Sequence, residues 1–414
     1  MKIPFSPPFI NESVKNEVLD SLESGWITTG PKVKKLEGQI CELTKAPQVL
    51  CVNSWTSGAL LMLKWFGVQP EDEVIIPAYT YSATALAVIH AHAKPVMVDV
   101  SDDFNISLEA IEKAITNKTK VIFPVDIAGW PCDYNQINDL VLQKKNLFRP
   151  NNEIQKNLGR IMVVSGRILV VSDAAHSIGA EYDGKQTGVL TDVTIFSLHA
   201  VKNVTTAEGG AICLNLPLPF NNEELYNTLR CYSLNGQTKD AFTKSKAGAW
   251  SYDIIYPGLK INMPDVLAAI GIGQMESYTS MALPERIRIF EDYNDHFSNK
   301  DWAIIPQYKS NIKRSSCHIY ALRIEGINEE ERDQIITLIA NFDVAVNVHF
   351  KPLPLLSLFK EMGYSINDYP NAYKQYANEI SLPIYPQLSK EDIAFVIKAV
   401  CESVEQVLYA QEKL

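Results

Sequence analysis

Short apolar runs alternate with stretches of helical periodicity over much of the chain. The apolar runs lie at 50–52, 74–76, 95–98, 121–123, 168–171, 194–196 and 209–213. Helical stretches follow the first of these runs from Ser57 and recur at 83–91 and 107–115. Strands that alternate with helices are joined by right-handed crossovers, which place helices on both faces of a mainly parallel sheet. The pattern therefore predicts an α/β fold with a mainly parallel central sheet covered by helices.

Both ends of the chain depart from this alternation. Near the start, Val14, Val18 and Leu22 recur at helical spacing, with Asn11 or Ser13 as the expected cap and Gly25 as the expected end. From residue 282, a long helical pattern leads into a sparser β-α-β-α pattern that ends in a helix at 389–411. We predict an N-terminal helix and loop at 1–30, a large domain at 31–281 and a smaller C-terminal α+β domain at 282–414.

A polar stretch interrupts the alternation at 141–166. It contains the runs Gln143-Lys144-Lys145-Asn146 and Asn151-Asn152 and shows little periodicity. We predict a surface insertion within the large domain.

Composition narrows the class of protein. At 414 residues and 46% hydrophobic residues, the chain is long enough to bury a large core. Its formal charge of −10 argues against nucleic acid as a partner, because binding to a phosphate backbone needs clustered Lys and Arg. Any phosphate that it binds must be held by local donors.

The cysteines and the apolar segments indicate a cytoplasmic protein. The seven cysteines are scattered and never form a C-x-x-C pair, as expected of reduced thiols. The first residues, Met1 to Pro8, contain no apolar run typical of a signal peptide. No stretch reaches the roughly 18 apolar residues that a membrane span needs, so we expect no membrane association.

Polar residues directly after the predicted strands are the candidate chemistry, because ligands of open α/β sheets bind at the carboxyl ends of the strands. After Val52, hydroxyl groups including Thr56 and Ser57 open a helix, which suits a phosphate but is also common in simple helix caps. After Val171, Asp173 could pair with the pyridine nitrogen of pyridoxal phosphate (PLP) or cap a helix. Asp173 and His176 could share a metal, but no third ligand lies nearby, so a metal site is the least favoured reading.

A further candidate is a lysine in the loop after residue 196. Lys202 lies in the mostly apolar segment Ser197-Leu198-His199-Ala200-Val201-Lys202-Asn203, ahead of Gly209-Gly210. Burial of a lysine lowers its pKa and frees the amine for imine chemistry, although most lysines are solvated surface charges. Ser197 would add a phosphate contact, and Tyr81 offers an aromatic face that could equally be core packing. A phosphate loop, an aromatic ring, an acid and a lysine, each after a separate strand, together point to PLP.

With these motifs, the chain resembles the DegT family of sugar aminotransferases, and within it the branch that aminates 4-keto nucleotide sugars. The matching stretches lie at 24–31, 72–77, 95–100, 173–180, 196–203, 257–263, 348–353 and 381–386. The resemblance implies the type I fold of PLP-dependent transferases, that of aspartate aminotransferase. It also implies a homodimer with shared active sites.

Residue by residue, the resemblance assigns roles to the candidate site. Lys202 would carry PLP as a Schiff base and move protons, and Asp173 would face the pyridine nitrogen. His176 stands where many members have Gln and would contact the ring or its 3-hydroxyl, while Tyr81 would stack on the ring. The phosphate would be held by Thr56, Ser57 and Ser197 and, across the dimer interface, by Lys260 or Asn262 of the partner's copy, where the family has a Gly-x-Asn-x-Arg-Met hairpin.

The resemblance also implies an activity. The enzyme would move an amino group from glutamate to a 4-keto, or less favoured 3-keto, nucleotide-linked sugar for surface polysaccharide or glycan biosynthesis. The expected substrate contacts are Trp26, Thr28, Thr29, His199 and His349. Trp26 could equally be a packing residue.

Three other kinds of protein compete with this activity. A PLP-dependent sugar dehydratase on the same fold would have histidine in place of Lys202. A non-catalytic sensor or interaction protein would be expected to lose Lys202 or Asp173, and both are present. A nicotinamide dehydrogenase would need G-x-G-x-x-G after the first strand, where the sequence reads Asn53-Ser54-Trp55-Thr56-Ser57-Gly58.

Overall fold

The structure is a computed structural model that describes residues 2–159, 166–244 and 247–411. Within these residues, a seven-stranded sheet has the order β1-β9-β8-β5-β4-β2-β3. Its strands are β1 (Gln48–Val52), β2 (Glu73–Pro77), β3 (Lys94–Val98), β4 (Thr119–Ile122), β5 (Leu169–Asp173), β8 (Val193–Ser197) and β9 (Gly210–Leu214). β9 is antiparallel to both of its neighbours, and the remaining pairs are parallel. The predicted mainly parallel α/β sheet is confirmed.

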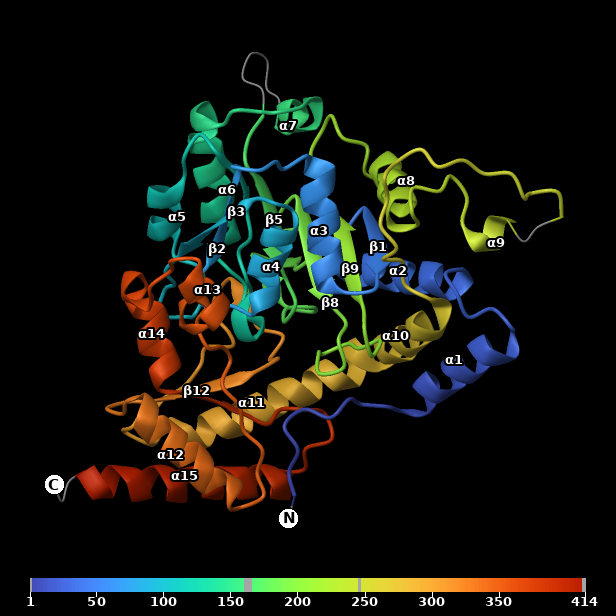
Figure 1. The fold of residues 1–414 in the computed structure, drawn as a ribbon. Coiled ribbons are helices and arrows are strands. Elements are labelled where there is room, and N and C mark those ends of the chain that lie inside the picture. The colour runs from blue at the N-terminus through green and yellow to red at the C-terminus, as the bar shows by residue number, and fades with distance from the viewer. Residues whose placement is uncertain (1, 160–165, 245–246, 412–414) are drawn as a thin grey trace.

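Helices cover both faces of this sheet (Figure 1). The helices up to residue 277 are α1 (Glu12–Glu23), α2 (Pro31–Thr44), α3 (Trp55–Phe66), α4 (Ser82–His90), α5 (Leu108–Ala114), α6 (Tyr134–Gln143), α7 (Glu153–Asn157), α8 (Asn222–Ser233), α9 (Ala241–Lys244) and α10 (Asp265–Ser277), of which α1 packs on α10 and α9 lies away from the sheet. Along β1, Leu50 and Val52 pack into the core that contains α3, whereas Val49 and Cys51 pack into the core that contains α2 and α10. Successive side chains of a strand point to opposite faces, so one short apolar run supplies both cores.

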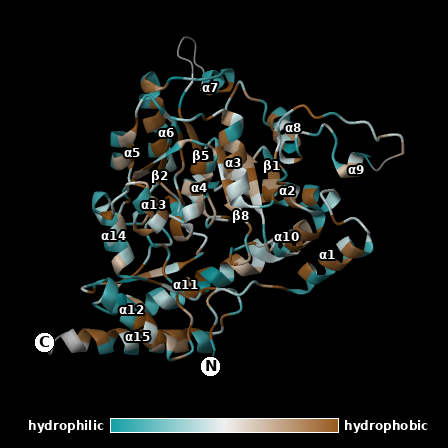
Figure 2. Ribbon diagram, viewed as in Figure 1, coloured by the Kyte–Doolittle hydropathy of each residue, from teal (hydrophilic) through white to brown (hydrophobic). Residues whose placement is uncertain are grey.

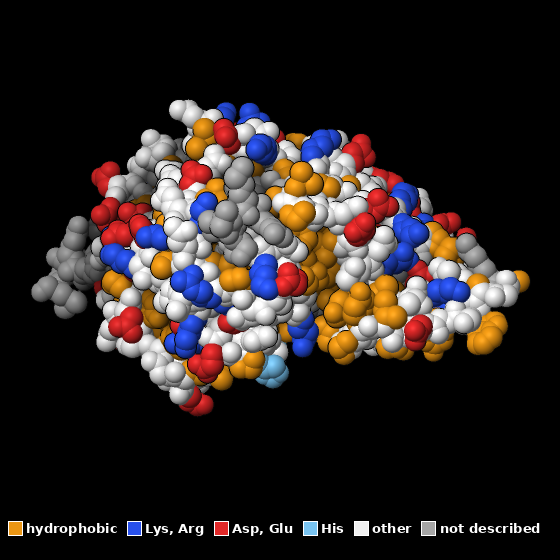
Figure 3. All heavy atoms as spheres, turned by 90° about the horizontal axis from the view of Figure 1, so that it is seen from above, with side chains coloured by type: hydrophobic (Ala, Val, Ile, Leu, Met, Phe, Trp, Pro, Cys, Tyr) orange, Lys and Arg blue, Asp and Glu red, His pale blue; other side chains and the backbone are white. Residues whose placement is uncertain are grey.

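Hydropathy follows the same layers. Figure 2 shows apolar ribbon concentrated in the central sheet and on the inner sides of its helices. Figure 3, seen from the α7 end, shows Lys and Arg side chains interspersed with Asp and Glu over that face. No helix of the described residues is both long enough and apolar enough to cross a membrane.

The C-terminal part contains a separate apolar cluster. Its elements are α11 (Leu283–Phe297), β10 (Ala303–Ile304), β11 (Lys313–Arg314), β12 (Tyr320–Ile324), α12 (Glu329–Ala340), α13 (Ser357–Glu361), α14 (Pro370–Ala377), β13 (Glu379–Leu382) and α15 (Lys390–Gln411). β10, β12 and β13 form an antiparallel sheet, and β11 pairs with the hairpin of β6 (Glu181–Tyr182) and β7 (Lys185–Gln186). A π-helical turn, Tyr278–Ala282, joins α10 to α11, so the proposed domain boundary at 282 falls inside one continuous helical rod.

The N-terminal segment bridges the two parts. Ile3 donates a backbone hydrogen bond to Asp343 and accepts one from Ala345, both in the C-terminal part, and its side chain belongs to that core. The chain then reaches α1, which is capped by the Asn11 side chain as one of the two predicted caps. Gly25 follows the helix with a positive φ, as its predicted role as helix terminator requires.

The polar stretch predicted as an insertion is attached to the body of the protein. Its first residues complete α6, and residues 160–165 lie outside the described residues. Gln155 is fully buried and donates to the carbonyl oxygen of Phe66, while Asn151 donates to the Asp72 carboxylate. These contacts anchor α7 to the α3–β2 connection.

Candidate functional site

A cavity of about 470 Å³ lies at the carboxyl ends of the parallel strands, where the sequence predicted the site. It collects side chains from the N-terminal segment, from the turns after β1, β2, β5 and β8, and from two segments of the C-terminal part. The polar and aromatic lining residues are Phe5, Ser6, Ser54, Trp55, Thr56, Thr80, Tyr81, Thr84, Asp173, His176, Ser197, His199, Lys202, Glu208, His318, His349 and Phe350.

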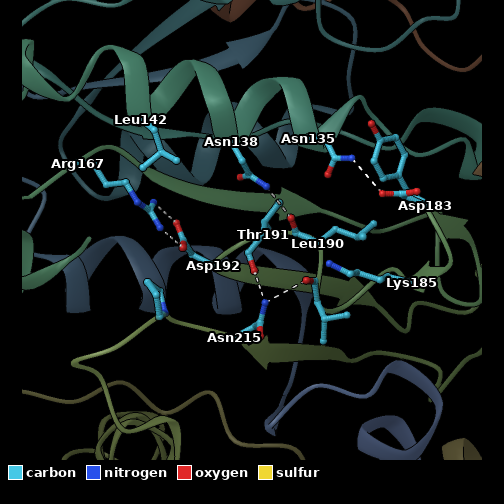
Figure 4. Close-up of a pocket in the computed structure, with 13 residues that line it drawn as sticks. Asn135, Asn138, Leu142, Arg167, Asp183, Lys185, Leu190, Thr191, Asp192 and Asn215 are labelled. Carbon is cyan, nitrogen blue, oxygen red and sulfur yellow. Dashed lines mark hydrogen bonds and ion pairs between the residues drawn. The ribbon is translucent and has the colours of Figure 1, made fainter. Parts of the chain in front are cut away.

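A second hollow, of about 270 Å³, lies at the opposite ends of the strands (Figure 4). Several of its polar side chains already bind neighbouring side chains or backbone carbonyls. Arg167 forms a two-point ion pair with Asp192, and Asn215 donates to the carbonyl oxygens of Val189 and Thr191. These interactions tie the starts of β5 and β8 to the end of β9, so we place the functional site in the larger cavity.

Lys202 is the lysine of the larger cavity. It sits in the loop between β8 and β9, where its backbone N–H donates to the carbonyl oxygen of His199 at 2.9 Å. Burial lowers the pKa of Lys202 to about 8, while the nearby charge of Asp173 acts in the opposite direction. Its amine therefore has an appreciable neutral fraction near pH 7, as a nucleophilic lysine requires.

Asp173 ends β5 and is 4% exposed. Its carboxylate accepts hydrogen bonds from the Thr84 hydroxyl at 2.8 Å and from the Ala175 backbone N–H at 3.2 Å. Burial raises the pKa of Asp173 to about 7, against these two hydrogen bonds and the charge of Lys202. Thr84 was not predicted as a site residue, because a threonine in the first turn of a helix has no distinctive sequence pattern.

The N-terminus of α3 closes another side of the cavity. Ser54 caps the helix by accepting from the Ser57 backbone N–H, and its hydroxyl donates to the Ser57 hydroxyl at 2.9 Å. Ser54 and Thr56 line the cavity, whereas Ser57, which was predicted to bind phosphate, does not. Gly210 allows this arrangement, because a Cβ there would lie 2.6–2.7 Å from the Ser54 and Trp55 backbone. Free N–H groups and the helix dipole make this terminus suited to an anion.

Aromatic rings and histidines form the remaining wall. Tyr81 is 61% exposed and lies 5.9 Å from the Phe350 ring, which stacks on His176 at 5.7 Å between ring centroids. Burial holds the pKa of His176 well below its usual value, so the ring is neutral. Its Nδ1 accepts from the Ala128 backbone N–H at 3.2 Å, so Nε2 carries the proton and is the donor.

His318 is a further cavity residue that the sequence did not indicate. Its Nδ1 lies 2.8 Å from Oδ1 of Asn203, the residue next to Lys202. The Asn203 amide nitrogen donates to the carbonyl oxygen of Ser316 at 2.9 Å, which fixes the direction of the side chain. His318 therefore holds the lysine loop against the C-terminal part. The contact joins residues 115 positions apart, and no local pattern predicts it.

Six predicted site residues lie outside the cavity of the single chain. They are Trp26, Thr28, Thr29, Ser57, Lys260 and Asn262. The Trp26 indole donates to the Thr29 carbonyl oxygen, and the ring packs edge-on against Phe242. Lys260 donates to Asn262 Oδ1 at 2.6 Å, and Asn262 donates to the Thr29 hydroxyl. The loop at 26–29 and the 260–262 segment thus form one cluster beside the end of β1, where Asn53 N–H donates to the Ile261 carbonyl oxygen.

The donor set fits PLP. A neutral amine can meet the aldehyde, a buried carboxylate can face the pyridine nitrogen, and a helix N-terminus can hold the phosphate. Comparisons with known proteins decide the family. The model of the DegT/DnrJ/EryC1/StrS aminotransferase family matches residues 8–148 and 161–401. The chain belongs to this family.

Individual members are similar over their full length. The spore coat polysaccharide biosynthesis protein SpsC of Bacillus subtilis is 34% identical over 97% of both chains. The UDP-4-amino-4-deoxy-L-arabinose–oxoglutarate aminotransferase of Shewanella sediminis is 33% identical over 97% of this chain and 98% of its own. Among solved structures, the Streptococcus pneumoniae protein Spr1654, named as a sugar aminotransferase, is 42% identical in its PMP form, with a TM-score of 0.93 over 98% of this chain and 100% of its own.

Membership of the DegT/DnrJ/EryC1/StrS family confirms the resemblance, the type I fold and PLP as the cofactor. The chain is a PLP-dependent aminotransferase of this family. The family model leaves residues 149–160 unmatched, which include α7. The predicted roles of individual site residues stay predictions.

Proposed function

We propose that this enzyme transfers an amino group from glutamate to a 4-keto sugar linked to a nucleotide, in polysaccharide or glycan biosynthesis. The observation that carries the proposal is Lys202, whose partly neutral amine shares one cavity with the buried Asp173 carboxylate. The names of the Bacillus and Shewanella relatives support a sugar substrate and polysaccharide synthesis.

The residues of the chain divide the chemistry among them. Bound PLP supplies the electron sink that makes a proton on the reacting carbon acidic. Asp173 would hold a proton on the pyridine nitrogen, and Lys202 Nζ would move the carbon-bound proton between the two carbons that flank the transferred nitrogen. The neutral histidines, His176 and His318, would bind polar groups without adding charge.

Anions in this cavity need donors beyond the single chain. Among the described residues that line it, Lys202 is the only Lys or Arg, while a nucleotide sugar and glutamate bring several negative charges. Lys260 lies nearby outside the cavity, and we propose that it enters the site of a partner subunit in a homodimer.

Exposed apolar side chains support the dimer. Trp250 is 78% exposed and Ile254 53%, in a segment that pairs with Gln237 close to Lys260. Leu19 and Leu22 on α1 are 54% and 53% exposed. Apolar side chains gathered on a surface are typical of a contact with another chain.

A substrate panel tests the proposal. The PLP-loaded enzyme and glutamate are incubated with 3-keto and 4-keto nucleotide sugars, and the position of the new amine is located by NMR. We expect 2-oxoglutarate to form together with a 4-amino sugar. A 3-amino product would move the amination to C3. A dehydrated sugar, or no reaction with either substrate class, would contradict an aminotransferase of this type.

A further inference from the structure

A fully buried carboxyl group lies behind the cavity and has no role in the chemistry described above. It belongs to Glu379, the first residue of β13, which is 0% exposed. One carboxyl oxygen shares a hydrogen bond with the Ser381 hydroxyl, and the other accepts the backbone N–H of His349 at 3.0 Å. The Ser381 hydroxyl in turn lies 2.9 Å from Nδ1 of His349. A continuous hydrogen-bonded chain therefore runs from the buried acid to an imidazole that lines the cavity.

His349 is held in place through both its backbone and its ring. Its backbone carbonyl oxygen accepts a hydrogen bond from the Tyr79 hydroxyl at 2.7 Å. Its ring stacks on Phe5 with centroids 5.4 Å apart and meets the edge of Phe350 at 4.9 Å. Since Nδ1 faces Ser381, only Nε2 remains without a partner among the described residues. Nε2 is thus the atom left to meet a ligand.

The number of protons in this chain limits what Nε2 can do. Burial, together with the charge of Lys202, lowers the pKa of His349 to about 3, so its ring carries a single proton. If Glu379 is protonated, it donates to Ser381, Ser381 donates to Nδ1, and the ring proton sits on Nε2. If Glu379 is ionised, Ser381 donates to the carboxylate, Nδ1 carries the ring proton and donates to Ser381, and Nε2 is bare.

We propose that Glu379 is a positioning residue that, through Ser381, makes Nε2 of His349 a hydrogen-bond donor to an oxygen acceptor of the nucleotide sugar, and an acceptor once Glu379 ionises. The proposal rests on the proposed function for the identity of that ligand. The proton balance is simple. On ionisation the Nε2 proton leaves to solvent, the Glu379 proton moves to the Ser381 oxygen, and the Ser381 proton moves to Nδ1 of His349. The negative charge stays on Glu379.

The surroundings of Glu379 favour the neutral acid. The charged or titratable groups that face it are Arg323 on β12, Arg332 on α12, Tyr79 after β2, and His349. Arg332 binds Asp333 and the Tyr376 carbonyl oxygen, and Arg323 reaches Gln375, so neither forms an ion pair with the Glu379 carboxylate within the described residues. Burial raises the pKa of Glu379 to about 8, against the opposing effects of Ser381, the His349 N–H and the two arginines. The donor form of His349 therefore prevails at neutral pH.

NMR of the PLP-loaded enzyme with ¹⁵N-labelled histidine tests the relay without turnover. The His349 signals, assigned by their loss in His349→Phe, should report the Nε2–H tautomer at pH 6.5 and the Nδ1–H tautomer above pH 9. Glu379→Gln keeps a permanent donor toward Ser381, so its His349 should stay Nε2–H throughout. Glu325→Gln, on an exposed side chain, is the control and should behave as the native enzyme.

Kinetics provide the second readout. In the native enzyme, KM for a UDP-linked 4-keto sugar should rise about 2–10-fold between pH 7 and 9, the range of one lost hydrogen bond, with a smaller change in kcat. In Glu379→Gln this rise should be absent. Ser381→Ala, which keeps the acid but breaks the chain, should also uncouple the His349 tautomer from pH.

Two results would overturn the proposal: an identical tautomer profile in the native enzyme and Glu379→Gln, or a tautomer that still follows pH in Ser381→Ala. Failure of the proposed function is a different result. It would appear as the absence of 2-oxoglutarate when the native enzyme meets glutamate and the keto sugar, while the tautomer measurement stays interpretable.

Discussion

The Asp173 carboxylate and the Lys202 amine of the cavity have pKa values close to each other because desolvation shifts the two values toward one another. Burial raises the pKa of Asp173 to about 7 and lowers that of Lys202 to about 8, and each group partly offsets the shift of the other. Near neutral pH, each of the two groups is therefore present partly in its ionised form and partly in its neutral form. This balance leaves part of Lys202 as a free amine, able to react with an aldehyde.

The pH dependence of PLP incorporation tests this balance. Lys202 loses its proton as the pH rises, so the rate at which the PLP-free protein takes up PLP should increase with pH and level off above about pH 8. With a pKa of about 8, about a tenth of the Lys202 amines are neutral at pH 7, a far larger fraction than for an unperturbed lysine. The measurement is the absorbance change after rapid mixing. A rate that climbs steadily to pH 10 would mean that the lysine is not desolvated.

Asp173→Asn gives the matched change. Asp173 raises the pKa of Lys202 by its charge, so its loss should move the midpoint of this profile below that of the native protein. An unchanged or higher midpoint would show that the two groups do not interact as described.

At the scale of elements, the site depends on the close approach of β9 to the N-terminus of α3. Gly210→Ala would place a Cβ against the Ser54 and Trp55 backbone, which has no flexible end to move aside. We predict a loss of about 1–3 kcal/mol in unfolding free energy, as for overpacked cores, together with weaker PLP binding. Urea unfolding and a PLP titration measure the two effects.

Gly38→Ala is the control for that substitution. Gly38 lies within α2, has open space where a Cβ would be, and should gain up to about 1 kcal/mol from helix propensity. If Gly210→Ala behaved like Gly38→Ala, the close approach would not limit the site.

The elements also explain which parts of the site the sequence could predict. Asp173, Lys202 and Thr56 each follow an apolar run, and ligands of open α/β sheets bind at the ends of the strands. The sequence therefore predicted that these residues share one site, and all three line one cavity in the structure. The direction of β9 was not predictable, because an apolar run has a period but no direction. His318, Thr84 and Phe5 were missed, since their approach depends on packing between distant segments rather than on a local pattern. Ser57 lies in the same turn, where its hydroxyl accepts a hydrogen bond from the capping Ser54, and its phosphate contact stays a prediction.

At the scale of the whole molecule, Lys202 is the only Lys or Arg among the described residues that line the cavity, although the proposed ligands are anions. In the proposed dimer, a second copy would cover the exposed apolar side chains near Lys260 and on α1 and would supply the further cation. The large part and the C-terminal part of the chain, each with its own apolar core, are bridged by the N-terminal segment and by the helical rod of α10 and α11, so both parts hold the cavity walls.

Mixing subunits tests the shared site. Lys202→Ala should be inactive, and Lys260→Ala should bind PLP more weakly. In a mixed dimer, one site combines the intact Lys202 of one subunit with the intact Lys260 of the other. Activity at limiting PLP should therefore rise when the two variants are unfolded and refolded together. No gain over the separately refolded variants, with dimers present, would exclude a contribution of Lys260 across the interface.

The most direct test of the central claim is borohydride reduction of the PLP-loaded protein, followed by peptide mapping. We predict a single pyridoxyl group on the peptide that contains Lys202, and none in Lys202→Ala, which should retain the native circular dichroism spectrum. A protein that fails to bind PLP, or a label that falls on another lysine while Lys202→Ala still turns over repeatedly, would contradict the account.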